Sequence, residues 1–323
     1  MTTILEIEKL NVSYQGTSIL QNINMKVEKG EILGIVGESG SGKSTLLKAM
    51  IGLLGDNGRV ESGRISFEQV DLLRISSREL RNIRGAQLGM VFQNPGMSFN
   101  PIRKIGAQFL EALKNHGKID ESQATKQILD MFTRLGLREG KRILNSYPFE
   151  LSGGMNQRVA IALAMILNPQ LLLADEPTSA LDVTVQAQCV KEMMDLRQHL
   201  GTTIIIVTHN MGVVSHMADK VAVMYAGSIV EYGSKADVLN HPKHPYTKAL
   251  IASIPQIGGT IPKGIPGQPP AFGEVFTGCS FSPRCSLYRR RASHYLSHYP
   301  GFTKKTYPSL HKTQNGVCYY LIH

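Results

Sequence analysis

The feature that most constrains the fold is a glycine-rich segment at residues 37–45, with the sequence GESGSGKST. It matches the pattern G-x-x-x-x-G-K-[ST], follows an apolar run at residues 31–36 and precedes a helix-like run at residues 46–51. In a strand–loop–helix unit of this kind, successive backbone N–H groups and the positive end of the helix dipole face one bound phosphate. The segment therefore predicts a phosphate-binding loop within an α/β fold.

The same loop predicts which side chains contact a nucleotide. Lys43 is expected to reach the β- and γ-phosphates of ATP, and the Ser44 hydroxyl is expected to bind Mg²⁺. A chance glycine-rich turn would match the pattern in about one chain in a hundred of this length, so we favour the nucleotide site. The candidate ligands in the loop are Gly37, Ser39, Gly40, Gly42, Lys43, Ser44 and Thr45.

Composition indicates a soluble protein with a large core. The chain has 323 residues, of which 42% are hydrophobic and 19% charged, a length that suggests one large domain and a smaller one. The longest uninterrupted apolar run, at residues 159–167, has nine residues and is too short to cross a membrane. The N-terminus lacks a basic region followed by an apolar run, so we expect no signal peptide and a cytoplasmic location.

Positive charge is concentrated near the C-terminus. The formal net charge is +10, and residues 236–323 contain ten Lys or Arg residues against two Asp or Glu residues. Such a basic region is typical of nucleic-acid or anionic-membrane binding, and equally of a solvated tail. Because the first 235 residues carry a net charge of only +2, the sequence does not indicate a dedicated nucleic-acid-binding protein.

Two apolar segments lead into polar residues that suit a nucleotide site. Residues 171–174 predict a buried strand followed by Asp175, a candidate Mg²⁺ ligand, and Glu176, a candidate general base. The strand predicted at residues 202–207 leads into His209. This histidine is as compatible with a γ-phosphate contact as with an ordinary surface or core position.

Weaker signals come from single polar or aromatic residues and from a second helix start. Gln93 follows a short apolar strand, and Tyr14 follows the first predicted strand, where it could stack on a purine or simply pack. Ser152 is a candidate N-cap, and Gly153 and Gly154 follow it in the first turn of a helix. Two glycines there leave backbone N–H groups open to an anion, which predicts a second phosphate contact.

In this order, the motifs resemble those of the ATPase subunit of an ATP-binding cassette (ABC) transporter. The resemblance covers about residues 1–235. It includes the phosphate loop, Gln93, the LSGGM sequence at residues 151–155, Asp175 and Glu176 at the end of a predicted strand, the SALD sequence at residues 179–182, and His209. It implies a P-loop α/β core with a helical subdomain, an N-terminal antiparallel β subdomain and an irregular C-terminal extension.

The resemblance also implies a head-to-tail dimer with two ATP molecules at its interface. The phosphate loop of one subunit would then face the LSGGM helix start of the other. The implied roles are adenine stacking for Tyr14, Mg²⁺ contact and sensing of the membrane partner for Gln93, Mg²⁺ binding for Asp175, general-base catalysis for Glu176, γ-phosphate contact for His209, and contacts across the interface for Ser152, Gly153, Gly154 and Asp182.

The C-terminal sequence narrows the resemblance to importers of oligopeptides, dipeptides and nickel. It is carried by HPYTKAL at residues 244–250 and by GCSFSPRC at residues 278–285. The implied organisation is a nucleotide-binding domain at residues 1–233, with a helical subdomain at about residues 95–160, and an importer-type extension at residues 234–323.

Cysteines in the extension suggest a metal site. Some relatives bind a 4Fe–4S cluster there through four cysteines, whereas this chain has Cys279, Cys285 and Cys318. The alternatives are a cluster with an open or substituted ligand, such as His294, a zinc site, and thiols without a metal. Cys189 lies elsewhere and is expected in the core.

The leading functional hypothesis is an ATPase subunit that drives import of di- or oligopeptides. It requires separate permease subunits in the membrane, a second ATPase subunit, identical or different, and indirectly an extracytoplasmic substrate-binding protein. The chain would lie peripherally at the cytoplasmic face of the cell membrane and bind no nucleic acid. Alternatives are the same role in a nickel or metal-chelate importer, a soluble ABC ATPase acting on nucleic acid, and a nucleotide-gated scaffold without catalysis.

Overall fold

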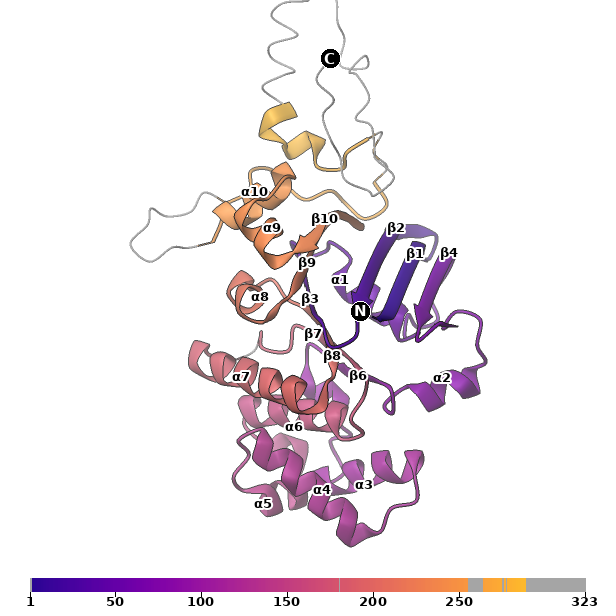
Figure 1. Ribbon diagram of the computed structural model, residues 1–323, viewed down its shortest axis with the longest axis vertical. Coiled ribbons are helices and arrows are strands. Elements are labelled where there is room, and N and C mark those ends of the chain that lie inside the picture. The colour runs from indigo at the N-terminus through magenta and orange to yellow at the C-terminus, as the bar shows by residue number, and fades with distance from the viewer. Residues whose placement is uncertain (1, 180, 255–263, 275, 277, 289–323) are drawn as a thin grey trace, which may run out of the picture.

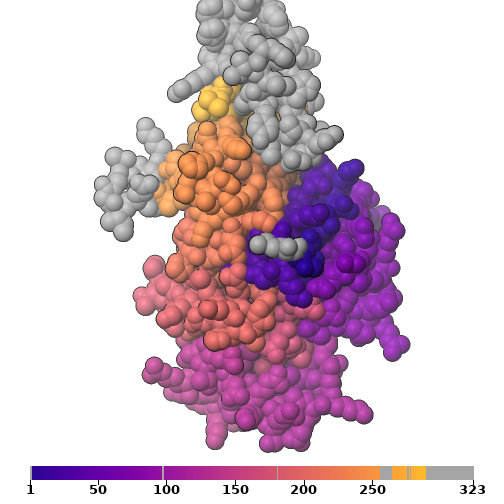
Figure 2. All heavy atoms as spheres, in the orientation of Figure 1, coloured from indigo at the N-terminus to yellow at the C-terminus, as the bar shows by residue number. Residues whose placement is uncertain are grey.

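The computed structural model describes residues 2–179, 181–254, 264–274, 276 and 278–288. Its described strands form a four-stranded sheet, ordered β2-β1-β4-β5, and a six-stranded sheet, ordered β10-β9-β3-β8-β7-β6. A helical region lies at one end of the molecule, and the described part of the C-terminal extension lies at the other (Figure 1, Figure 2).

The four-stranded sheet is antiparallel and packs on the helix that follows the phosphate loop. Ile7 and Ile65 pair across β1 and β4, and both belong to the buried cluster that contains Leu46 and Leu47 of that helix. Alternating apolar residues therefore bury one face of this sheet, as the period of two predicts. Its strands are β1 (Thr3–Tyr14), β2 (Thr17–Glu28), β4 (Gly58–Phe67) and β5 (Val70–Asp71).

The six-stranded sheet brings the carboxyl ends of three buried strands to one edge. Every residue of β3, β7 and β8 is buried, because a parallel sheet is covered on both faces. Ile35 and Asp175 both pair with Val207, so the segments that follow these strands emerge side by side. The strands are β3 (Ile32–Val36), β6 (Leu88–Val91), β7 (Leu171–Asp175), β8 (Thr203–Val207), β9 (Lys220–Tyr225) and β10 (Ser228–Ser234).

The helical region has a core of its own that continues into the large sheet. Phe109 and Phe132 meet edge-on there, with ring centroids 5.3 Å apart, in a cluster that also contains Val91 of β6. Its elements are η1 (Pro95–Ser98), α3 (Ile105–His116), α4 (Glu121–Arg134), α5 (Gly140–Asn145), η2 (Pro148–Glu150) and α6 (Gly153–Met165). The remaining core helices are α1 (Lys43–Met50), α2 (Ser77–Ile83), α7 (Val183–Leu200) and α8 (Met211–Met217).

The extension packs against β9 of the large sheet through aromatic side chains. Tyr225 of β9, Tyr246 and Phe281 are mutually in contact, with ring centroids between 4.6 and 5.4 Å apart. The extension was expected to be irregular, but the structure shows that part of it forms regular elements. Pro245 does not prevent this, because it occupies the first turn of a helix, where proline is favourable. These elements are α9 (Lys235–Asn240), α10 (Pro245–Ala252) and η3 (Ser282–Arg284).

The strand and helix predicted around the glycine-rich segment are confirmed. The helix begins at Lys43 rather than at residue 46, since the last loop residues form its first turn and Gly42 is the N-cap. Within the described residues, no helix combines the length and the apolar character that a bilayer span requires.

Candidate nucleotide-binding site

Two positions of the glycine-rich loop require glycine for steric reasons. Gly37 has a φ of 156° and Gly42 a φ of 98°. A Cβ atom on Gly37 would lie 2.2 Å from the Met224 carbonyl oxygen, and one on Gly42 would lie 2.7 Å from Leu20 Cδ2. The loop therefore lies directly against β2 and β9, which fixes the path of its backbone.

Lys43 is buried inside the loop. Only 8% of the residue is exposed, and its Nζ atom donates to the carbonyl oxygens of Gly37 (2.8 Å) and Glu38 (2.9 Å). Burial lowers the pKa of the Lys43 amine, while the carboxylates of Glu176 and Asp175 oppose that shift. These acids favour the protonated amine, which is the form that a phosphate group needs.

Ser44 and Asp175 place two oxygen donors next to each other. The Ser44 hydroxyl donates to Asp175 Oδ1 over 2.9 Å, and Asp175 is only 4% exposed at the end of β7. Burial raises the pKa of the Asp175 carboxyl, and the hydrogen bond from Ser44 acts in the opposite direction. Hydroxyl and carboxylate oxygens are donors of the kind that Mg²⁺ prefers, so this pair fits a Mg²⁺ site.

Glu176 and His209 are in direct contact. Glu176 Oε1 accepts a hydrogen bond from the His209 backbone N–H (3.0 Å) and lies 2.9 Å from His209 Nδ1. The Glu176 Oε2 atom is buried and has no hydrogen-bond partner among the described residues. Glu176 also has a φ of 48°, a conformation that is uncommon outside glycine and is often found at functional sites. One carboxylate oxygen is therefore anchored, whereas the other is buried without a partner among the described residues.

Lys43, Ser44, Glu176 and His209 line one cavity of about 510 Å³, and Asp175 contacts this lining through its hydrogen bond from Ser44. Gln93, an exposed residue directly after β6, contributes to it together with Glu176 and His209. Phe272 of the extension also lines the cavity, and sequence reasoning did not anticipate it, because an aromatic residue in a stretch rich in Gly and Pro has no periodic pattern around it. The lining residues are Ser39, Gly40, Ser41, Gly42, Lys43, Ser44, Thr45, Gln93, Glu176, His209 and Phe272.

The structure places the remaining candidates away from this cavity. Tyr14 ends β1, opposite Thr17 of β2 and Gly58 of β4. Ser152 caps α6 by accepting the Met155 N–H. Asp182 caps α7 by accepting hydrogen bonds from two backbone N–H groups, each with a donor–acceptor distance of 3.0 Å. Gly153 and Gly154 begin α6 beside Ser152.

The described cysteines do not complete a metal site. Cys279 Sγ lies 3.7 Å from His244 Nε2, a neighbour that sequence reasoning missed, and Cys285 is buried. Among the described residues, no three His, Cys, Asp or Glu side chains gather closely enough to hold a metal ion. Cys318 and His294 lie outside the described residues. Cys189 is buried in α7, as expected, and burial raises the pKa of its thiol to about 12.

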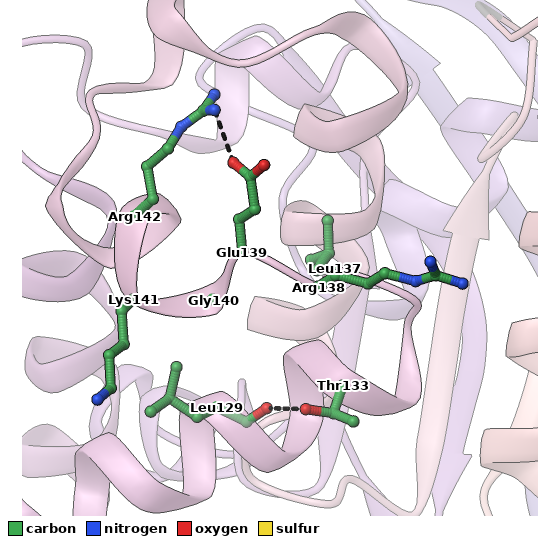
Figure 3. A pocket seen from close by; sticks show the side chains of 8 residues that line it. All are labelled: Leu129, Thr133, Leu137, Arg138, Glu139, Gly140, Lys141 and Arg142. Atoms are coloured by element: carbon green, nitrogen blue, oxygen red, sulfur yellow. Dashed lines mark hydrogen bonds and ion pairs between the residues drawn. The ribbon is translucent and has the colours of Figure 1, made fainter.

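A second cavity, of about 340 Å³, lies in the helical region near α4 and α5 (Figure 3). Its Arg142 and Glu139 side chains pair with each other over 2.6 Å, and the Thr133 hydroxyl donates to the Leu129 carbonyl oxygen. The cavity contains none of the loop, acid or histidine groups described above, so it is separate from the nucleotide site.

Comparison with known proteins agrees with this geometry. Residues 20–179 match the family described as ABC transporter, and residues 230–291 match the family described as oligopeptide/dipeptide transporter, C-terminal region. The oligopeptide transport ATP-binding protein OppD of Bacillus subtilis is 43% identical over 294 residues, which cover 88% of this chain and 82% of that protein. The chain belongs to the ABC transporter ATP-binding proteins. The family resemblance expected from the sequence is thereby confirmed.

Other relatives agree with this assignment. OppD of Haemophilus influenzae is 43% identical, with 89% of this chain and 90% of that protein covered. The dipeptide transport ATP-binding protein DppD of Bacillus subtilis is 41% identical, with 88% and 87% covered.

Solved structures confirm the ABC ATPase fold. The ATP-binding cassette MJ0796, solved as a dimer in a post-hydrolysis state with ADP and Pi, superposes with a TM-score of 0.65 at 27% identity, over 72% of this chain and 99% of that chain. As a member of this family, the chain is an ATPase subunit that uses ATP with Mg²⁺.

Proposed function

We propose that this ABC ATPase drives the import of oligopeptides or dipeptides through separate permease subunits. The observation that carries the proposal is the convergence of Lys43, Ser44, Asp175, Glu176 and His209 at one sheet edge in a chain whose residues 230–291 match the oligopeptide/dipeptide transporter C-terminal region. Relatives named for oligopeptide and dipeptide transport support the same substrate class. The chain would sit at the cytoplasmic face of the membrane.

The phosphate loop would bind the β- and γ-phosphates. Its backbone N–H groups and the start of α1 supply a positive field, and Lys43 adds a full charge. Ser44 and Asp175 would hold Mg²⁺, with Gln93 at the cavity wall as a further oxygen donor. A Mg²⁺ ion held by these residues would supply neutralisation of charge on the phosphates, which phosphoryl transfer requires together with positioning.

Glu176 would act as the general base. Its Oε2 atom is buried, lacks a partner among the described residues and belongs to a side chain at the cavity wall, so it is placed to accept a proton from an attacking water. His209 would hold the other oxygen through its backbone N–H and ring nitrogen. With 69% of its side chain exposed, the imidazole can also reach the γ-phosphate.

The candidates outside the cavity would complete the site in a head-to-tail dimer. Ser152, Gly153, Gly154 and Asp182 cap or begin helices away from the phosphate loop, as groups that serve the second subunit's nucleotide would. Tyr14 would stack on the adenine. The dimeric structure of the related cassette MJ0796 supports such an arrangement. The second subunit would be another copy of this chain or a homologous ATPase.

The domain division proposed from the sequence, residues 1–233 and 234–323, falls within β10. The described cysteines and histidine of the extension that lie near each other are Cys279 and the neighbouring His244, and Cys318 lies outside the described residues, so a cluster in the extension stays a prediction.

The decisive test is ATP turnover by the membrane complex isolated with this chain. Phosphate release is measured with the peptide-loaded and with the empty extracytoplasmic binding protein. Peptide import predicts faster release with the loaded form, and a complex with Lys43→Ala should release none. Stimulation only by a binding protein loaded with nickel or a metal chelate would move the assignment to a metal importer.

A further inference from the structure

An ion pair between Arg284 and Glu38 connects the extension to the phosphate loop. Arg284 Nη1 and Nη2 donate to Glu38 Oε2 (2.6 Å) and Oε1 (3.0 Å), so the two planar groups form a fork of two hydrogen bonds. The Arg284 side chain is only 4% exposed, and that of Glu38 is 25% exposed. Glu38 is the second residue of the glycine-rich loop, whereas Arg284 lies 246 positions further along the chain.

Glu38 joins the extension to the lysine of the loop. Its carbonyl oxygen accepts a hydrogen bond from Lys43 Nζ (2.9 Å), and its backbone N–H donates to the Tyr246 hydroxyl of α10 (2.9 Å). Its carboxylate is also among the groups that oppose the lowering of the Lys43 pKa by burial. Both the backbone and the side chain of one loop residue are therefore fixed by the extension.

Arg284 is itself held by its surroundings. Its Nε and Nη2 atoms donate to the carbonyl oxygens of Pro266 (3.0 Å) and Ile265 (3.3 Å). Its guanidinium carbon lies 5.8 Å from the ring centroid of Tyr225, within cation–π distance. A guanidinium with partners on several sides has little freedom to leave Glu38.

The extension touches the loop at a second point. Phe272 lines the nucleotide cavity, and a Cβ atom on Gly40 would lie 3.5 Å from its ring. The next residue, Gly273, packs against Thr17 at the start of β2. The described part of the extension thus contacts the loop at two places, at Gly40 through Phe272 and at Glu38 through Arg284.

We propose that Arg284 is a positioning residue for the phosphate loop, acting through Glu38, so that ATP affinity depends on the C-terminal extension. The inference rests on the proposed nucleotide site and deepens it. Without Arg284, the carboxylate of Glu38, the second residue of the phosphate loop, loses its countercharge, and its negative charge then opposes the binding of a phosphate anion by the same loop. The same loss frees the backbone segment that accepts the Lys43 hydrogen bonds.

The test is equilibrium binding of ATP with Mg²⁺ to the full chain and to matched variants. Arg284→Met is expected to weaken ATP binding about tenfold, within the range of coupling between groups of one network. Adding Glu38→Gln to Arg284→Met should restore part of the affinity, because the unpaired charge is gone. Arg284→Lys keeps a charge without the fork and should lie between Arg284→Met and wild type.

Arg197→Met is the control for a lost arginine. Arg197 also donates to a backbone carbonyl oxygen, that of Gly30, and pairs with Asp219 (2.9 Å), and neither of these residues lines the nucleotide cavity. Its ATP affinity should match that of wild type. If Arg284→Met does not fold, as judged by circular dichroism, Arg284→Lys decides the question.

Three results would overturn the inference. They are wild-type affinity in the Arg284 variants, no recovery on adding Glu38→Gln, and an equal loss in Arg197→Met. Failure of the proposed function looks different: wild type itself would then not bind ATP, or would bind it as well as Lys43→Ala does.

Discussion

Replacing Glu176 by glutamine separates two roles of this side chain. Glu176 Oε1 accepts the His209 N–H over 3.0 Å, and an amide oxygen in the same place accepts the same hydrogen bond. The amide nitrogen would take the place of Oε2, which has no partner among the described residues, so no existing hydrogen bond is displaced there. Glu176→Gln therefore keeps the anchored geometry and removes the proton acceptor.

The expected loss is set by general-base catalysis. Turnover should fall about 10²–10⁴-fold, which corresponds to about 3–5 kcal/mol of transition-state stabilisation. ATP affinity should stay close to that of wild type, because Lys43 and Ser44 are untouched. In the proposed head-to-tail dimer, an ATP-bound form should then accumulate, since the γ-phosphate that would bridge the subunits is no longer removed.

The assay is phosphate release by the membrane complex at saturating Mg²⁺ and ATP, with ATP binding and the oligomeric state of the isolated chain measured on the same variant. Glu176→Asp is the matched control, because it keeps a carboxylate on a shorter side chain and should retain part of the activity. Near-normal turnover in Glu176→Gln would refute the general-base role. Loss of ATP binding would instead refute the argument that the geometry is preserved.

Three further predictions concern single positions. Gly42→Ala should destabilise the protein by about 1–3 kcal/mol, because a non-glycine residue is strained at a φ of 98° and its Cβ would meet Leu20; thermal unfolding measures this, and an unchanged midpoint would contradict it. Asp175→Asn should abolish turnover yet raise the thermal midpoint at neutral pH. Burial raises the pKa of Asp175 in the folded state, so its charged form opposes folding, and the gain should shrink as the pH falls through that raised pKa. The Cys189 thiol, with its pKa raised by burial to about 12, should resist alkylation at pH 8 until the protein unfolds. Mass spectrometry of the labelled chain measures this, and alkylation of Cys189 in the folded protein would contradict it.

Much of the fold around the site follows from local sequence pattern. Continuous apolar strands predict a parallel sheet, and parallel strands share one edge at their carboxyl ends, so Asp175 and His209 were expected near the phosphate loop. The neighbouring positions of β7 and β8 then bring Glu176 against His209. The period of the side chains and the continuous apolar character of a buried strand are both properties of short segments, which is why the sequence reveals them.

Other parts of the site depend on contacts between distant segments. The Arg284–Glu38 pair and the position of Phe272 result from the path of a chain rich in Gly and Pro, for which no local periodicity exists. The left-handed backbone of Glu176 is imposed by its surroundings, since glutamate does not favour it. His244 beside Cys279 likewise pairs residues 35 positions apart.

The separation between Glu38 and Arg284 has a consequence for biosynthesis. The two residues are 246 positions apart, and a ribosome adds about 5–20 residues per second, so Arg284 is translated roughly 12–50 s after the loop that it contacts. A nascent chain that has already formed α1 and the surrounding strands still lacks this ion pair. The phosphate loop therefore gains its contact with Arg284 late in synthesis, when most of the polypeptide has left the ribosome.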